Sequence, residues 1–196
     1  MSFIVSSPSL KRVSDEQQRD VLFPSPVDGQ QVFNERINLT ETYNSNYGLW
    51  LSSNIRVMIR TTTAFLANRF VYINGSFPAG GTDRPTVDYP DNSTTDNQTI
   101  GVIVEIGSSI DVSRAFVAVA VAGEYFVEYG ESIAVGEYVH AKITIRTTGA
   151  NSDQGYAAGS SSSASGRVGI AFQNSGASPT FPNMILVNIG LVSETF

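Results

Sequence analysis

Apolar and polar residues alternate over short stretches of this chain with the two-residue period of β-strands. Residues 55–60 show the pattern clearly, with Ile55, Val57 and Ile59 on one face and polar or flexible side chains on the other. Residues 65–73 predict a further strand, or a short helical turn that runs into one. In the second half the pattern predicts strands at 100–106, 115–122, 124–127, 132–135, 138–146, 168–172 and 184–189, with glycines between several of them. Because this half has no sustained helical periodicity, we expect an all-β fold.

These strands divide into two small β units preceded by an extended N-terminal arm. The arm comprises residues 1–27, punctuated by prolines, with at most one short helical turn after Ser14. Residues 28–98 form a β-rich N-terminal domain that ends in a long polar loop from about residue 74. Residues 99–196 form a C-terminal β-barrel or sandwich, in which the Gly- and Ser-rich residues 149–166 are an exposed loop.

The arm carries two apolar clusters, and these are candidate partner-binding residues. The first cluster is Phe3, Ile4 and Val5, and the second, at the end of the arm, contains Leu22 and Phe23. One interpretation is a frayed terminus. The other is an arm that docks on a neighbouring subunit, which removes both clusters from water.

The composition limits the kinds of partner. Only 15% of the residues are charged, against about 25% in an ordinary soluble domain. The net charge is −6, and an acidic chain is a poor ligand for nucleic acid because phosphate binding needs a concentrated basic surface. The chain has no cysteine, which excludes disulfides and thiolate metal sites. No apolar run approaches the roughly 20 residues that span a bilayer, so we expect no membrane partner.

Residues that could carry chemistry are few, and each has a simpler structural explanation. His140 is the one histidine and lies in an alternating stretch, which predicts a partly exposed strand residue rather than a catalytic base. The clustered Glu124, Glu128, Glu131 and Glu137 are expected at strand ends and turns, where charge keeps a protein soluble. The glycines of residues 155–166 lack the strand and helix of a dinucleotide site. We therefore expect no enzyme activity, no cofactor and no small-molecule substrate.

One loop has the residue types of a metal site. Asp83, Asp88, Asp91 and Asp96 are close together, and calcium binds loop carboxylates. Their spacing does not fit the EF-hand, and Arg84 offsets part of the charge. A solvated acidic loop is the favoured interpretation, so no metal is expected.

Three aromatic residues, Tyr43, Tyr47 and Trp50, form a further candidate partner-binding group. Beside Asn44 and Ser45 they could stack on a sugar, as in a receptor-binding module. The favoured alternative is that they pack a small β core or a subunit interface, where aromatic residues are enriched.

The second half of the chain resembles the capsid cement, or head-decoration, proteins of tailed bacteriophages. The resemblance lies in a strand followed by the pattern G-x-x-I-x-x-G-x-x-V, then a loop, then G-x-V-G-I-A and a closing strand. The matching residues are Gly130, Ile133, Gly136 and Val139, then Gly166, Val168, Gly169 and Ile170, and last the strand at 184–189. More weakly, the segment from Pro26 to Phe33, with Tyr43, Asn44 and Trp50, resembles short β modules of phage fibres and baseplate-associated proteins.

The first resemblance implies a homotrimeric β-barrel made in the host cytoplasm and bound to the outer capsid surface of the virion. Such a structural protein bridges capsomers of the major capsid protein and stabilises the assembled head. The second resemblance implies an alternative, a fibre or head-spike module that binds the host surface or a glycan.

Overall fold

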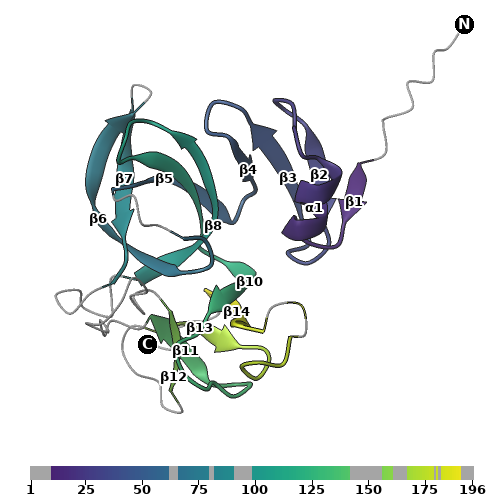
Figure 1. The fold of residues 1–196 in the computed structure, drawn as a ribbon, viewed down its shortest axis with the longest axis vertical. Coiled ribbons are helices and arrows are strands. Elements are labelled where there is room, and N and C mark those ends of the chain that lie inside the picture. Colours follow the sequence, from purple (N-terminus) through teal and green to yellow (C-terminus); the bar gives the residue numbers. More distant parts are fainter. Residues whose placement is uncertain are drawn as a thin grey trace, which may run out of the picture.

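The computed structural model describes residues 10–61, 66–79, 82–90, 99–141, 156–160, 167–178, 180 and 182–190. Within these residues the chain forms β-strands and one short helix, which confirms the expected all-β fold. The strands form three groups: an N-terminal sheet, a closed barrel and a C-terminal sheet (Figure 1).

The N-terminal sheet has the strand order β1-β2-β3-β4. Its strands are β1 (Lys11–Val13), β2 (Gln31–Asn34), β3 (Leu39–Asn44) and β4 (Leu49–Leu51). Helix α1 (Glu16–Leu22) follows β1, and its N-cap residue Asp15 accepts a hydrogen bond of 2.8 Å from the Gln18 backbone N–H. Residues 10–27 were expected in an extended arm. Residues 11–13 instead form an edge strand that pairs in parallel with β2, and the short helical turn expected after Ser14 is the capped helix α1.

The barrel has the order β5-β7-β6-β8-β9 and is closed by the pairing of β9 with β5. Its strands are β5 (Ile55–Arg60), β6 (Phe70–Ala79), β7 (Thr82–Asp88), β8 (Thr99–Ser109) and β9 (Ala115–Ala120). Much of the expected polar loop from residue 74 is therefore the β6–β7 hairpin. The expected boundary at residue 98 falls inside the barrel, between β7 and β8. Backbone pairing holds the hairpin without an apolar pattern, so the alternation of side chains did not reveal it.

The C-terminal sheet has the order β10-β14-β13-β11-β12. Its strands are β10 (Gly123–Glu128), β11 (Tyr138–Ala141), β12 (Ala157–Ser160), β13 (Arg167–Ala171) and β14 (Met184–Ile189). Two expectations fail here. Residues 132–135 form no strand, and part of the expected loop at 149–166 is β12, which pairs with β11. Small alanine and glycine side chains make up most of β12, so it lacked the apolar signal of a strand.

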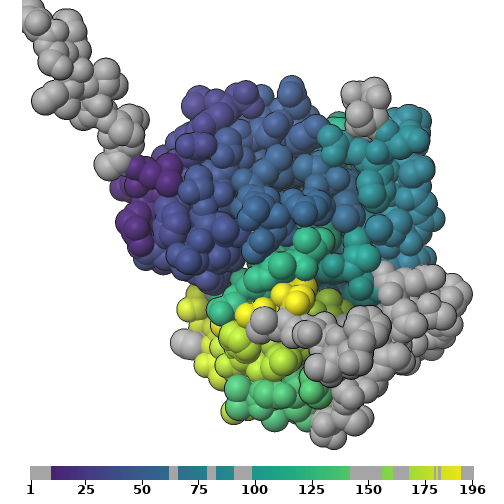
Figure 2. Space-filling model, turned by 180° about the vertical axis from the view of Figure 1, so that it is seen from behind, coloured from purple at the N-terminus to yellow at the C-terminus, as the bar shows by residue number. Residues whose placement is uncertain are grey.

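One apolar core joins the three groups. Ile37, in the turn between β2 and β3, packs in the same buried cluster as Phe70 and Val102 of the barrel and Val127 and Ile185 of the C-terminal sheet. Figure 2 shows the N-terminal part, in purple and blue, lying against the C-terminal sheet, in green and yellow. The place where the three groups meet is therefore a packed interior, and it also holds the charged residues described next.

Candidate functional site

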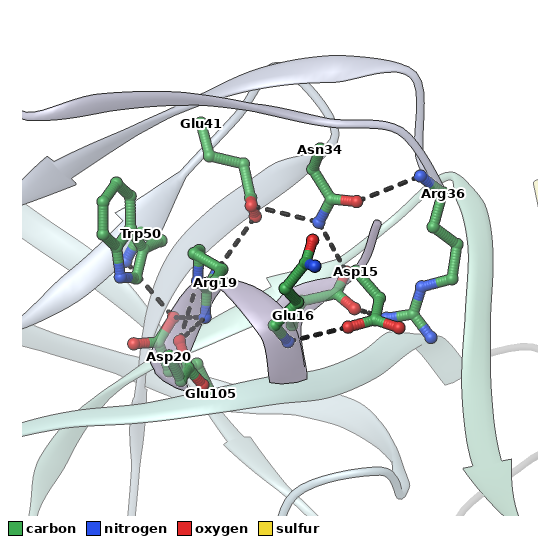
Figure 3. Close-up of polar contacts among 10 residues, drawn as sticks. Asp15, Glu16, Arg19, Asp20, Asn34, Arg36, Glu41, Trp50 and Glu105 are labelled. Carbon is green, nitrogen blue, oxygen red and sulfur yellow. Dashed lines mark hydrogen bonds and ion pairs between the residues drawn. The ribbon is translucent and has the colours of Figure 1, made fainter. Parts of the chain in front are cut away.

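A buried ion pair links α1 to the N-terminal sheet. Arg19 faces the sheet with 3% of its side chain exposed, and Glu41 on β3 is 1% exposed. The Arg19 Nη1 donates to Glu41 Oε1 over 3.0 Å (Figure 3). A buried guanidinium–carboxylate pair is stable only when its remaining polar atoms are also satisfied.

Glu105, on β8 of the barrel, extends this pair to a second structural group. Its Oε2 lies 3.4 Å from Arg19 Nη2 and accepts a hydrogen bond of 3.2 Å from the Trp50 backbone N–H. Burial raises the pKa of the Glu105 carboxyl from 4.5 to about 7, although Arg19 and the Trp50 N–H both favour the ionised form. Glu105 therefore changes its charge near neutral pH.

Asn34 connects the pair to a second arginine. The fully buried Asn34 side chain donates to Glu41 Oε2 and to Glu16 Oε1, both over 3.1 Å. Its Oδ1 accepts from the Arg36 backbone N–H over 3.1 Å. Arg36 forms an ion pair with Glu16 and lies over the ring of Phe126 on β10, with its guanidinium carbon 5.1 Å from the ring centroid. Burial lowers the pKa of Arg36.

A cavity of about 290 Å³ lies beside this network. All three structural groups line it, including Asp15, Glu16 and Asp20 at α1, Val104 of the barrel, and Tyr125 and Phe126 of the C-terminal sheet. Neighbouring strand residues point to opposite faces of a sheet, and β10 is an edge strand of its sheet. Since Tyr125 and Phe126 both line the cavity, it lies along the edge of β10.

Tyr125, one of the residues that line the cavity, carries a buried hydroxyl group. Its side chain is 2% exposed, and its hydroxyl has no hydrogen-bond partner among the described residues. Burial, with the nearby Glu41 carboxylate, raises the pKa of the Tyr125 hydroxyl, so it is a neutral donor at ordinary pH. A buried hydroxyl without a partner costs free energy, and such a group merits a functional explanation.

The barrel and the C-terminal sheet share a second buried arginine. Arg69, just before β6, donates from Nε to Glu128 over 2.6 Å and from Nη2 to the Tyr156 hydroxyl over 2.8 Å. Its guanidinium carbon also lies 4.3 Å from the centroid of the Tyr156 ring. These contacts hold the two groups together and do not line the cavity.

Of the predicted partner-binding residues, three form a small core. Trp50 is 2% exposed and packs with Phe23 and Tyr43, at ring-centroid distances of 6.1 and 5.4 Å. Phe23, Tyr43 and Trp50 are thus brought together as the interior of the N-terminal sheet, with Val13 and Val32. The packing alternative for these aromatic residues fits this arrangement, and the Trp50 ring is not placed to stack on a sugar.

The other predicted partner-binding residues lie apart from this core. The Tyr47 ring packs against Phe116 of the barrel, with centroids 4.9 Å apart, and its hydroxyl accepts from Arg84. Leu22, at the end of α1, is 43% exposed and is available to a partner. Phe3, Ile4 and Val5 lie outside the described residues.

The residues considered for catalysis and metal binding do not converge where the structure describes them. His140 is half-buried on β11, as expected. Asp83 and Asp88 lie on β7, whereas Asp91 and Asp96 fall outside the described residues. Among the residues that the structure describes, no group of three or more His, Cys, Asp or Glu side chains is arranged to hold a metal ion. No helix in the described part of the chain is long and apolar enough to cross a membrane.

The described residues of the motif that resembles the cement proteins lie in the C-terminal sheet and in the connection between β10 and β11, and Gly166 lies outside the described residues. Ile133 and Val139 are buried in its core, and Gly136 has a φ of +85°, which a turn glycine adopts readily. A Cβ on Gly169 would lie 2.2 Å from the Asn188 carbonyl oxygen, so the close pairing of β13 with β14 at this point requires glycine. Comparison with protein-family models, curated proteins and solved structures finds no match.

Sequence reasoning missed the residues of the charged junction, which we define as Arg19, Asn34, Arg36, Glu41 and Glu105. One signal was present in the predicted strand at 100–106, where Glu105 shares a face with Ile103. A charged residue on the inward face of a strand indicates a buried partner. The partner itself lies far away in sequence, 22 residues from Glu41 and 86 from Glu105.

Proposed function

We propose that this chain is a bacteriophage capsid decoration protein. It binds the outer surface of the assembled head and bridges capsomers of the major capsid protein. The resemblance of its C-terminal sheet to the cement proteins suggests the role, and the all-β fold is compatible with it. The observation that carries the proposal is the set of exposed apolar side chains at the start of the described chain.

These side chains are concentrated in residues 10–27. Four of the ten exposed large apolar residues in the described part of the chain are found there: Leu10, Val21, Leu22 and Val27. Val21 is 74% exposed, although it lies on a helix whose opposite side buries Arg19. Val21 and Leu22 are consecutive, and consecutive exposed apolar residues are typical of an interaction surface. A capsid or a second copy of this chain would cover them.

The proposed mechanism is mass action. A protein that binds only the assembled shell stabilises that shell by its binding free energy, repeated over many symmetric sites. A homotrimer on the outer capsid surface, made in the host cytoplasm, would present three copies of residues 10–27 to neighbouring capsomers. No catalytic step is part of this mechanism.

The test is binding to capsids that lack the protein, followed by measurement of particle heat resistance. We expect the protein to bind and to raise the melting temperature of the particles. The double variant Val21→Ser/Leu22→Ser should bind about tenfold more weakly or worse, because two apolar contacts are lost. Val112→Ser, at a residue that is 96% exposed outside this segment, is the matched control and should bind normally. Equal occupancy by all three proteins contradicts the proposal.

The alternative is a fibre or head-spike module that binds the host surface or a glycan. The sequence suggested that Trp50 could stack on a sugar, but its ring is buried and does not support this alternative. The polar cavity beside α1 is the observation that favours it. Binding of the isolated protein to host cells, in the absence of binding to capsids, would support this alternative over a decoration protein.

A further inference from the structure

Charged side chains, rather than apolar ones, hold helix α1 against the rest of the protein. The structure describes every residue of this helix, and only Arg19 is buried, whereas Val21 and Leu22 are 74% and 43% exposed. Glu16 makes a further contact, an ion pair with Arg36. A helix of seven residues is not stable alone in water. The position of α1 therefore depends on the charges around Arg19.

Three carboxylates share the guanidinium of Arg19 (Figure 3). It donates to Asp20 over 2.8 Å and to Glu41 over 3.0 Å, and it lies 3.4 Å from Glu105. One positive charge does not balance three negative charges. The Glu41 and Glu105 side chains are only 1% and 23% exposed, so water screens them poorly. Glu105 has the longest of the three contacts, and it therefore gains the least from Arg19 when it ionises.

The other described neighbours of Glu105 add no positive charge. On β4 the Trp50 backbone N–H donates to its Oε2, and β9 places the apolar Ala118 opposite it. On β10 the Tyr125 hydroxyl faces Glu41 and stays neutral at ordinary pH. Burial, with the Asp20 and Glu41 carboxylates, raises the pKa of Glu105 to about 7. The group therefore gains or loses its proton near neutral pH.

We propose that α1 is a latch controlled by the proton on Glu105. When Glu105 is protonated, the Arg19 guanidinium faces two carboxylates, and the helix stays on the barrel and the N-terminal sheet. When the proton is lost, the third carboxylate repels the other two and the helix lifts, while β1 before it stays paired and Phe23 after it stays packed on Trp50. Lifting the helix moves Val21 and Leu22, which are part of it. The latch follows from these contacts and does not rest on the capsid role.

The experiment is hydrogen exchange of the full chain at pH 5 and pH 8, with each rate corrected for the intrinsic effect of pH on exchange. The Arg19 and Phe23 amides report on the helix, since they donate to the Asp15 and Arg19 carbonyls over 3.0 and 2.9 Å. Because the lifted state returns Glu105 to water and binds fewer protons, protection of α1 should fall about tenfold or more from pH 5 to pH 8. Protection that is unchanged, or that rises with pH, overturns the proposal.

The barrel strands provide an internal reference in the same experiment. A latch opens while the barrel stays folded, so α1 should be less protected than the barrel at both pH values. Equal protection of α1 and the barrel would mean that the helix opens only when the whole protein unfolds, and this result also overturns the proposal. Both comparisons use the wild-type protein and need no variant.

The diagnostic variant is Glu105→Gln, which cannot ionise. Protection of its α1 amides should change by less than about twofold between pH 5 and pH 8. Glu35→Gln is the matched control, because Glu35 is exposed in the turn after β2 and pairs with Arg12 instead of Arg19. The control should show the full fall of wild type, and circular dichroism checks that both variants fold. The full fall in Glu105→Gln would overturn the assignment of the latch to Glu105.

Discussion

The barrel interior and the charged junction are both buried, but their side chains are opposites. Val71, Val87, Ile103, Val117 and Val119 fill the barrel and are fully buried, with no polar atom in any of these side chains. The junction buries arginine, asparagine and glutamate instead. Apolar packing is non-directional and tolerates small changes in volume, whereas each buried charge depends on specific partners in a defined geometry.

This difference indicates a division of roles. The barrel provides stability, because its backbone is closed by strand pairing and its core is apolar. The junction orients α1 against the barrel and the C-terminal sheet, and it places carboxylates beside a cavity. Substitutions that remove one group from each region measure how far the two differ.

The largest effect is expected from Arg19→Met. The variant leaves the Glu41 carboxylate buried without its guanidinium, which should lower the free energy of unfolding by roughly 3–5 kcal/mol. Chemical denaturation measures the loss. Arg12→Met is the control, because Arg12 pairs with Glu35 in solvent and its loss should cost less than about 1 kcal/mol.

A second variant tests whether the cost comes from the unpaired charge. Arg19→Met combined with Glu41→Leu removes both charges, so it should be more stable than Arg19→Met alone. If the double variant is the less stable of the two, the cost of Arg19→Met does not come from the unpaired Glu41 carboxylate.

The next effect is a dependence of stability on pH. Below pH 4.5 Glu105 is protonated in both states, and between pH 4.5 and about 7 only the folded protein keeps the proton. The contribution of this group is therefore fully present at low pH and is lost as pH rises through about 7, a change of about 3 kcal/mol. Glu105→Gln, which cannot ionise, should reduce the fall in stability between pH 5 and pH 8. Parallel pH profiles for the variant and wild type would contradict the assignment.

The smallest effect is expected in the barrel. Ile103→Val removes one methyl group from a fully buried side chain and should cost roughly 0.5–1.5 kcal/mol, without a change in the pH profile. Denaturation at pH 5 and pH 8 measures both quantities. A loss as large as that of Arg19→Met would remove the contrast between the two regions.

Several strands could be predicted because their signal is local. The alternation at 55–60 and 184–189 corresponds to β5 and β14, with the same bounds. Side chains on such a strand separate by face, so burial of one face leaves a period of two in the sequence. The β6–β7 hairpin lacked this signal, and its polar residues and prolines were interpreted as a loop.

The candidate site could not be predicted from local patterns in the sequence. Arg19 lies in a short polar stretch that looks like a solvated helical turn, and Tyr125 looks like an ordinary strand residue. Their roles depend on neighbours from β3, β8 and the turn before β3. Trp50 shows the converse: an aromatic residue among polar neighbours suggested exposure, and the fold buried it.

Sequence alone therefore determined the all-β class and the bounds of the most regular strands, since these depend on the local order of apolar and polar residues. The tertiary structure decided that residues on both sides of position 98 close one barrel, that residues 10–27 pack on a sheet, and that a cavity forms beside buried charges. Those outcomes depend on pairings between distant segments, and loop closure and burial favour such pairings without leaving a pattern in the local sequence.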